Sequence, residues 1–113
     1  MTPSSRPAAP APDAFAALAS PARRQLLMAL RGGPRSASEL AAGMSIGRPA
    51  VSEHLAALRA AGLARVEKRG RERYYHLDPR PLVDVGAWLN AMLVNWTRRL
   101  NDIKALSEKE KRR

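Results

Sequence analysis

The sequence contains no cysteine. This absence excludes disulfides, cysteine-ligated zinc fingers and thiol chemistry. The chain also lacks any stretch of about 18 apolar residues, the length that a membrane-spanning helix needs. Its first 12 residues have no apolar run of about 7–15 residues, which a secretory signal would carry. We therefore expect a soluble protein of the cytoplasm that has no membrane partner.

Side chains that could carry out catalysis or bind a metal are scarce. The two histidines, His54 and His76, are not accompanied by a cluster of ligands, so no metal site and no cofactor are predicted. The sequence shows no nucleophile–base pair, no paired catalytic carboxylates and no glycine-rich phosphate loop. These absences argue against an enzyme.

Acidic residues are also few compared with basic ones. The chain has 20 Lys and Arg but only 10 Asp and Glu, which gives a formal net charge of +10 at pH 7. Such an excess favours a polyanionic partner, most commonly nucleic acid. The 113 residues, 45% of them hydrophobic, are enough for one compact domain of modest stability, which a dimer would reinforce.

The two ends of the chain differ in composition from its body. Residues 1–12 are rich in Pro, Ala and Ser and are predicted to form a disordered arm. Residues 107–113 are almost all charged and are predicted to form a tail that frays. The folded domain is therefore expected to span residues 13–106.

Capping residues and apolar spacing divide this body into five helices and a β-hairpin. Ser20 followed by Pro21 is a helix start, and Ser36 with Glu39 has the spacing of a capping box. Glycines at 32, 43 and 62 mark helix ends. The predicted helices begin near Asp13, Ser20, Ser36, Arg48 and Pro81, the fourth covering 48–61 and the fifth 81–106, with strands at 63–67 and 73–77.

This order predicts a mainly α fold with a small β-hairpin, a winged helix-turn-helix. The third and fourth helices, joined by a tight turn, form the helix-turn-helix, and the hairpin at 65–73 forms the wing. Such a unit binds double-stranded DNA by placing its second helix in the major groove.

The fourth helix is the candidate recognition helix. Val51, Leu55 and Leu58 fall on one face and are expected to point inward. Arg48 at its start is suited to a guanine edge or a phosphate. Glu53 would either accept from a cytosine amino group or, as the favoured alternative, pair with a neighbouring arginine. The candidate DNA-binding residues of this helix are Arg48, Pro49, Ser52, Glu53, His54 and Arg59. An ordinary amphipathic surface helix, with His54 simply packed, is the alternative.

The hairpin is locally basic and turns at Gly70. Phosphate neutralisation by Lys and Arg supplies most of the sequence-independent affinity for DNA. A basic tip also suits a narrow minor groove. The candidate DNA-binding residues of the wing are Lys68, Arg69, Arg71 and Arg73. The competing interpretation is a solvated hairpin whose charges serve solubility.

The last helix carries more large apolar residues than a small domain can cover. We interpret this stripe first as a dimer interface, because two-fold dimers are the commonest assembly. Packing on the protein's own core is the second interpretation, and it is compatible with the first if the stripe is shared. A ligand pocket lined by the tryptophans is the third. The candidate interface residues are Phe15, Leu18, Trp88, Leu89, Met92, Trp96, Leu100 and Ile103.

Three segments together resemble the signature of ArsR-type repressors. They are residues 44–63 (MSIGRPAVSEHLAALRAAGL), residues 15–24 (FAALASPARR) and residues 69–79 (RGRERYYHLDP). The resemblance extends over about residues 13–106. It implies a homodimer, joined through its first and last helices, that binds an inverted-repeat operator and represses its own or neighbouring genes.

Two departures from the family pattern limit what this resemblance implies. Metal-sensing members carry a cysteine motif in the third helix, and residues 36–43 have none. Others use His and Asp ligands in the last helix, where this chain offers Asp84 and Asp102 but no His. The resemblance is therefore to the branch that does not sense metals, and neither an operator sequence nor an inducer is specified. Glu53 stands where many members carry a basic or amide residue.

Two other functions remain compatible with a winged helix. One is a protein-binding module that docks through its last helix, although the basic wing argues against it. The other is an architectural protein that binds DNA without regard to sequence.

Overall fold

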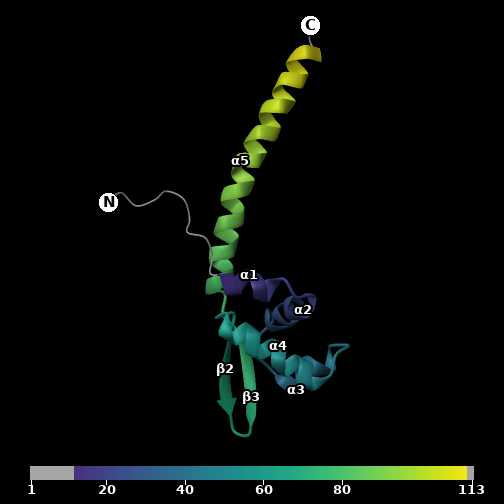
Figure 1. Ribbon diagram of the computed structural model, residues 1–113, viewed down its shortest axis with the longest axis vertical. Coiled ribbons are helices and arrows are strands. Elements are labelled where there is room, and N and C mark those ends of the chain that lie inside the picture. The colour runs from purple at the N-terminus through teal and green to yellow at the C-terminus, as the bar shows by residue number, and fades with distance from the viewer. Residues whose placement is uncertain (1–11, 112–113) are drawn as a thin grey trace, which may run out of the picture.

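The computed structural model describes residues 12–111, and it has the predicted winged helix-turn-helix fold (Figure 1). The predicted disordered arm lies outside the described residues except for Pro12, which begins the first helix. The elements in chain order are α1 (Pro12–Leu18), α2 (Pro21–Leu30), β1 (Arg35–Ser36), α3 (Ala37–Ala42), α4 (Arg48–Ala60), β2 (Ala64–Arg69), β3 (Glu72–Leu77) and α5 (Arg80–Lys111).

The predicted caps set the ends of the short helices. The Ser20 hydroxyl accepts a hydrogen bond from the backbone N–H of Arg23, 3.3 Å away, and so starts α2. The Ser36 hydroxyl accepts from the Glu39 N–H at 3.2 Å and donates to the Glu39 carboxylate at 3.1 Å, which starts α3. At the end of α4, Gly62 has a φ of +75°, a conformation that costs glycine little.

The short helix α1 is held against α2 by two arginine side chains. Arg23 donates to the backbone carbonyl of Ala16 at 3.3 Å, and Arg24 donates to that of Leu18 at 2.8 Å. Both carbonyls lie at the C-terminal end of α1, where helical carbonyls lack intrahelical partners. Arginines of the first turn of α2 therefore fix the position of α1.

The core lies among α2, α3, α4 and the base of the sheet. Its largest fully buried side chains are Leu26, Leu30, Val51, Leu55, Leu58 and Leu63. The three predicted inward residues of α4 are among them, so the outer face of α4 is left to solvent. Burying a leucine stabilises the fold by about 1.5–3 kcal/mol, and this cluster anchors α4.

The sheet has a third strand that the sequence did not reveal. Its order is β1-β3-β2, with Arg35 and Ser36 of β1 opposite Tyr75 and Tyr74 of β3. The hairpin turn is shorter than predicted, since Lys68 and Arg69 extend β2 and the strands are joined by Gly70 and Arg71 alone. Gly70 has a φ of +60°, which suits such a tight turn.

The last helix is longer than predicted. It begins at Arg80 and continues to Lys111, beyond the expected end at Leu106, so most of the expected separate tail is helical. Only its first turns pack on the body: Val85 is buried, and the ring of Trp88 meets that of Phe15 edge-on, with centroids 5.3 Å apart. Figure 1 shows the remainder rising from the body on the side away from the wing.

Most of the apolar stripe of α5 is exposed and does not pack on the protein's own core. Leu100 and Ile103 are exposed, and Trp96 keeps 57% of its surface accessible. The interpretation that this stripe packs on the protein's own core is therefore wrong beyond Trp88. Between residues 12 and 111, no helix combines the length and the apolar character that a membrane crossing requires.

Candidate nucleic-acid interface

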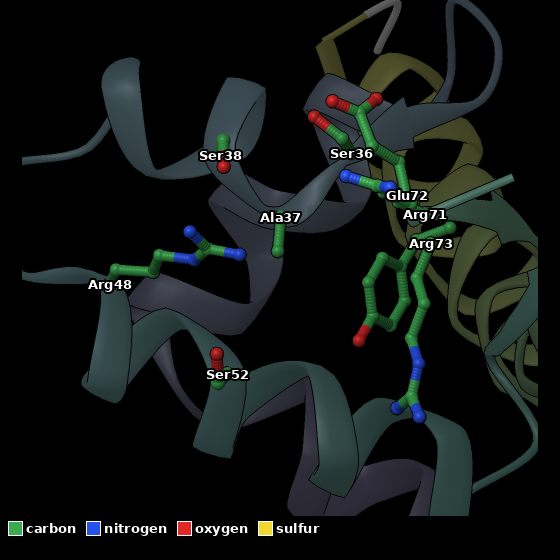
Figure 2. A pocket seen from close by; sticks show the side chains of 9 residues that line it. Ser36, Ala37, Ser38, Arg48, Ser52, Arg71, Glu72 and Arg73 are labelled. Atoms are coloured by element: carbon green, nitrogen blue, oxygen red, sulfur yellow. The ribbon is translucent and has the colours of Figure 1, made fainter. Parts of the chain in front are cut away.

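The start of α4, the start of α3 and the wing meet around one open groove. This groove has a volume of about 470 Å³. Figure 2 shows α4 on one side of it and the wing on the other. Its lining residues are Ser36, Ala37, Ser38, Arg48, Ser52, Arg71, Glu72, Arg73 and Tyr75.

From α4, the groove receives Arg48 and Ser52. These residues lie one helical turn apart and both are exposed. In Figure 2 the Arg48 guanidinium extends across the groove toward Ala37, and the Ser52 hydroxyl points into it. The first turn of α4 contains no acidic residue and has no side-chain cap, so the positive end of its dipole is not neutralised locally.

From the wing, the groove receives Arg71 and Arg73. In Figure 2 the Arg73 side chain extends toward α4, so that guanidinium groups from the recognition helix and from the wing lie on opposite sides of one space. Glu72 contributes the only carboxylate among the lining residues. That carboxylate accepts a hydrogen bond from the Tyr74 hydroxyl at 2.9 Å, which raises the pKa of Tyr74.

The other basic residues of the wing have different surroundings. Arg69 approaches Glu67, with 3.3 Å between its Nε and Oε1, and lies over the Tyr74 ring at 4.9 Å from the centroid. His76 is 2.7 Å from the same carboxylate. The hydrogen bonds from Arg69 and His76 lower the pKa of Glu67, which stays ionised. Lys68 is exposed and lies outside the groove.

The remaining predicted contact residues of α4 do not line the groove. Pro49 and Arg59 are exposed, and His54 is half-buried. Glu53 is exposed and forms no ion pair with any described residue, so the expected salt bridge to an arginine is wrong. Its carboxylate projects from the outer face of α4 because the inner face is occupied by the leucine core.

Four lining residues were not predicted from the sequence: Ser36, Ala37, Ser38 and Glu72. The capping box did locate the start of α3. Its proximity to the wing, however, depends on the pairing of β1 with β3, which places Ser36 opposite Tyr74. A two-residue strand carries no period-two pattern that could have indicated this pairing.

The predicted interface residues form an apolar surface on α1 and α5. Phe15 is 37% exposed, Leu18 and Trp88 are half-buried, and Leu89, Met92, Trp96, Leu100 and Ile103 are exposed. The third interpretation of this stripe is a pocket lined by both tryptophans. The depression beside Trp96 is lined by α5 residues alone, and Trp88 is not among them.

Residues 20–66 match the family described as bacterial regulatory protein, arsR family. The chain is 38% identical over 100 residues to the HTH-type transcriptional regulator Rv2034 of Mycobacterium tuberculosis. The aligned region covers 88% of this chain and 91% of that protein. The chain belongs to the ArsR family. It is therefore a winged-helix DNA-binding transcriptional regulator and not an enzyme.

Two further ArsR-family comparisons bear on how the protein works. The transcriptional repressor SdpR of Bacillus subtilis is 32% identical over 77 residues, covering 68% of this chain and 86% of SdpR. A solved structure from Mycobacterium bovis, Mb0332, is described as a homodimeric winged helix-turn-helix DNA-binding domain of a possible ArsR-family regulator. It superposes with a TM-score of 0.59 at 25% identity, over 74% of this chain and 76% of that one.

Among residues 12–111, no three His, Cys, Asp or Glu side chains come close enough together to hold a metal ion. Asp84 and Asp102, the two acidic candidates of α5 near its apolar surface, are both exposed.

Proposed function

We propose that this ArsR-family regulator is a homodimer that binds an inverted-repeat operator and represses its own or neighbouring genes. The observation that carries the proposal is the convergence of Arg48 and Ser52 from α4 with Arg71 and Arg73 from the wing around one groove. An arrangement of this kind allows a helix in the major groove and a hairpin on the adjacent backbone to bind the same duplex.

In this proposal the first half of α4 reads the major groove. Recognition helices contact base edges through their N-terminal residues. Ser52 is small, as is Ala56 one turn later, so the helix can approach the bases closely. Arg48 is long enough to donate to guanine O6 and N7 or to a phosphate. Glu53, exposed and not paired with a described residue, is placed to accept from a cytosine amino group.

The wing supplies contacts that do not depend on sequence. Arg71 and Arg73 neutralise phosphates beside the groove, and Lys68 lies opposite Arg73 on β2. Each neutralised phosphate releases counterions, so affinity falls as salt rises.

The dimer is supported by the apolar surface of α1 and α5. A two-fold partner would cover side chains that the body of one subunit leaves in water, and two-fold dimers are the commonest assembly. The homodimeric description of the Mycobacterium bovis domain agrees with this arrangement. Repression is supported by the likeness to SdpR, which is described as a repressor. Such a protein would work in the cytoplasm, beside the bacterial chromosome.

Selection of random duplexes by the purified full chain tests the proposal. We expect the sequenced fragments to share a palindromic motif, and Arg48→Ala to weaken binding to it by at least about tenfold. Arg31→Ala, an exposed arginine of equal charge outside the groove, serves as the control and should bind normally. Fragments that show no enrichment over random DNA would instead indicate an architectural role. A protein that is monomeric by light scattering and binds no DNA would indicate a protein-binding module.

A further inference from the structure

A buried carboxylate lies where the wing ends and the long helix begins. Asp78 follows β3 directly, and only 6% of its side chain is exposed. Three donors of Arg80 bond to it: the backbone N–H at 3.1 Å, Nε at 3.0 Å from Oδ1 and 3.3 Å from Oδ2, and Nη2 at 2.7 Å. A bidentate pair of this kind fixes both the distance and the angle between its partners.

The same residue is joined to the DNA-binding body. The Asp78 backbone N–H donates to the carbonyl of Leu63 at 2.9 Å, and Leu63 is fully buried directly after α4. Arg65 of β2 places its Nε 4.0 Å from the second carboxylate oxygen. Asp78 therefore connects the end of α4, the first residues of β2 and the first residue of α5.

The backbone around Asp78 has little freedom. Pro79 and Pro81 lie on either side of Arg80, and each proline ring fixes its own φ. The carbonyl of Pro79 accepts from the N–H of Val83 at 3.0 Å, so the first turn of α5 starts at the junction itself. A Cβ atom at Gly62, two residues after α4, would lie 3.6 Å from Cγ of Pro81, so the start of α5 lies close to the end of α4. The backbone between β3 and α5 is therefore rigid.

We infer that Asp78 is a positioning residue that sets the direction in which α5 leaves the body, and thereby the half-site spacing that the dimer accepts. The inference rests on the proposed dimer and deepens it. At 1.5 Å per residue, Trp96 lies about 24 Å along α5 from the junction. A tilt of about 10° there moves the dimer contact by about 4 Å, close to the rise of one base pair.

The other attachments of α5 are less directional. Leu82 packs against the core, Val85 is buried, and Trp88 meets Phe15 edge-on. These contacts are apolar, and apolar burial is non-directional, so it tolerates small changes of angle. Without the ion pair between Asp78 and Arg80, α5 would stay attached to the body but would adopt a wider range of tilt angles.

The test uses the palindrome selected with the full chain, in duplexes whose centre is lengthened or shortened by one base pair. Each change moves one half-site by about 3.4 Å and rotates it by about 35°. We expect wild-type affinity to fall by about tenfold or more at the altered spacings. Asp78→Asn keeps an oxygen that can accept from the Arg80 N–H but loses the charge. The affinity of this variant should fall by only about threefold at the altered spacings. Arg80→Met removes the other partner of the ion pair, and the Arg80 side chain is exposed. The affinity of this variant should also fall by only about threefold at the altered spacings.

Asp84→Asn is the matched control, because it removes the same charge from an exposed site on the same helix. It should keep the wild-type spacing preference. The inference is overturned if Asp78→Asn and Arg80→Met retain the wild-type penalty, or if they lose affinity equally at every spacing. It is also overturned if the wild type itself shows no spacing preference. A chain that selects no palindrome at all would instead refute the proposed function.

Discussion

Two arginines on either side of the wing turn, Arg69 and Arg71, look equivalent in the sequence but have different surroundings. Arg69 is engaged by the Glu67 carboxylate and lies over the Tyr74 ring. Arg71 forms no ion pair within residues 12–111 and lines the groove beside α4. Because a paired guanidinium has less net charge to offer a phosphate, Arg71 should contribute more to DNA binding.

We expect Arg71→Ala to weaken binding to every duplex and to reduce the slope of log affinity against log salt by about one. Arg69→Ala should reduce this slope by less, because the charge of Arg69 is already partly balanced by the Glu67 carboxylate. Fluorescence anisotropy with a labelled duplex, titrated at several salt concentrations, measures both slopes. Equal changes for the two variants would show that the ion pair of Arg69 opens on DNA.

Asp78 gives the protein a defined response to acid. Side-chain and backbone hydrogen bonds from Arg80 lower the pKa of Asp78 from an ordinary 3.8 to about 2. The folded state therefore holds the ionised form more tightly than the unfolded chain does. Its contribution to stability is present above pH 3.8 and is lost as the pH falls from 3.8 toward 2.

Urea unfolding between pH 5 and pH 2, within the range where this carboxyl titrates, measures that response. The difference in free energy of unfolding between wild type and Asp78→Asn should be largest at pH 5 and should shrink as the pH falls. Asp84→Asn, at the exposed carboxylate, should not show this trend. A difference that stays constant with pH would mean that the charge of Asp78 adds no stability.

Among the elements, α3 depends most on a single residue. It has six residues, too few for helix propensity alone to sustain it. Its start is fixed by Ser36, whose buried hydroxyl both accepts from and donates to Glu39. Ser36→Ala should lower the free energy of unfolding by about 1 kcal/mol. Ser38→Ala, two residues on and exposed, should change it by less than about 0.5 kcal/mol. Urea denaturation of both variants makes the comparison, and equal losses would contradict the role of the cap.

The elements that the sequence predicted well are those set by local signals. Ser20, Ser36 and Gly62 mark helix ends through their own hydrogen bonds or backbone conformation, and the leucines of α4 follow the helical period. The sequence did not reveal β1, because its two residues become a strand only through pairing with β3. The end of α5 was placed too early, because charged residues after Leu106 resemble a tail although they continue a helix.

Only those groove residues that lie at local signals could be predicted from the sequence. Arg48, Ser52, Arg71 and Arg73 could be proposed from their places at a helix start and a hairpin turn. That α3 and Tyr75 complete the lining depends on the packing of elements distant in sequence. Glu53 was expected to pair with an arginine because phosphates repel a carboxylate, but its place on the outer face of α4 leaves it in solvent.

At the scale of the whole molecule, the proposed dimer depends on the apolar surface of α5. Trp96 lies near the middle of this surface and is largely exposed in one subunit. We expect Trp96→Glu to give a folded monomer that loses binding to the palindrome, because a buried carboxylate without a partner is costly. Size-exclusion chromatography with light scattering measures the change.

Val94→Glu provides the matched control for that experiment. Val94 is also exposed on α5, but its position two residues from Trp96 places it about 200° around the helix. It should remain a dimer and bind the palindrome normally. If Trp96→Glu stays dimeric at micromolar concentration, the interface lies elsewhere.

The exposed apolar side of α5 makes the concentration of the protein itself a controlling variable. When association is incomplete, the amount of dimer rises with the square of the amount of subunit. Operator occupancy then changes more steeply than expression does. For a repressor of its own gene whose operators are mostly free, a twofold fall in copy number, such as follows cell growth without synthesis, lowers the number of bound operators about fourfold. If α5 forms the proposed dimer, the length of apolar helix beyond Trp88 sets how sharply such a gene responds to dilution.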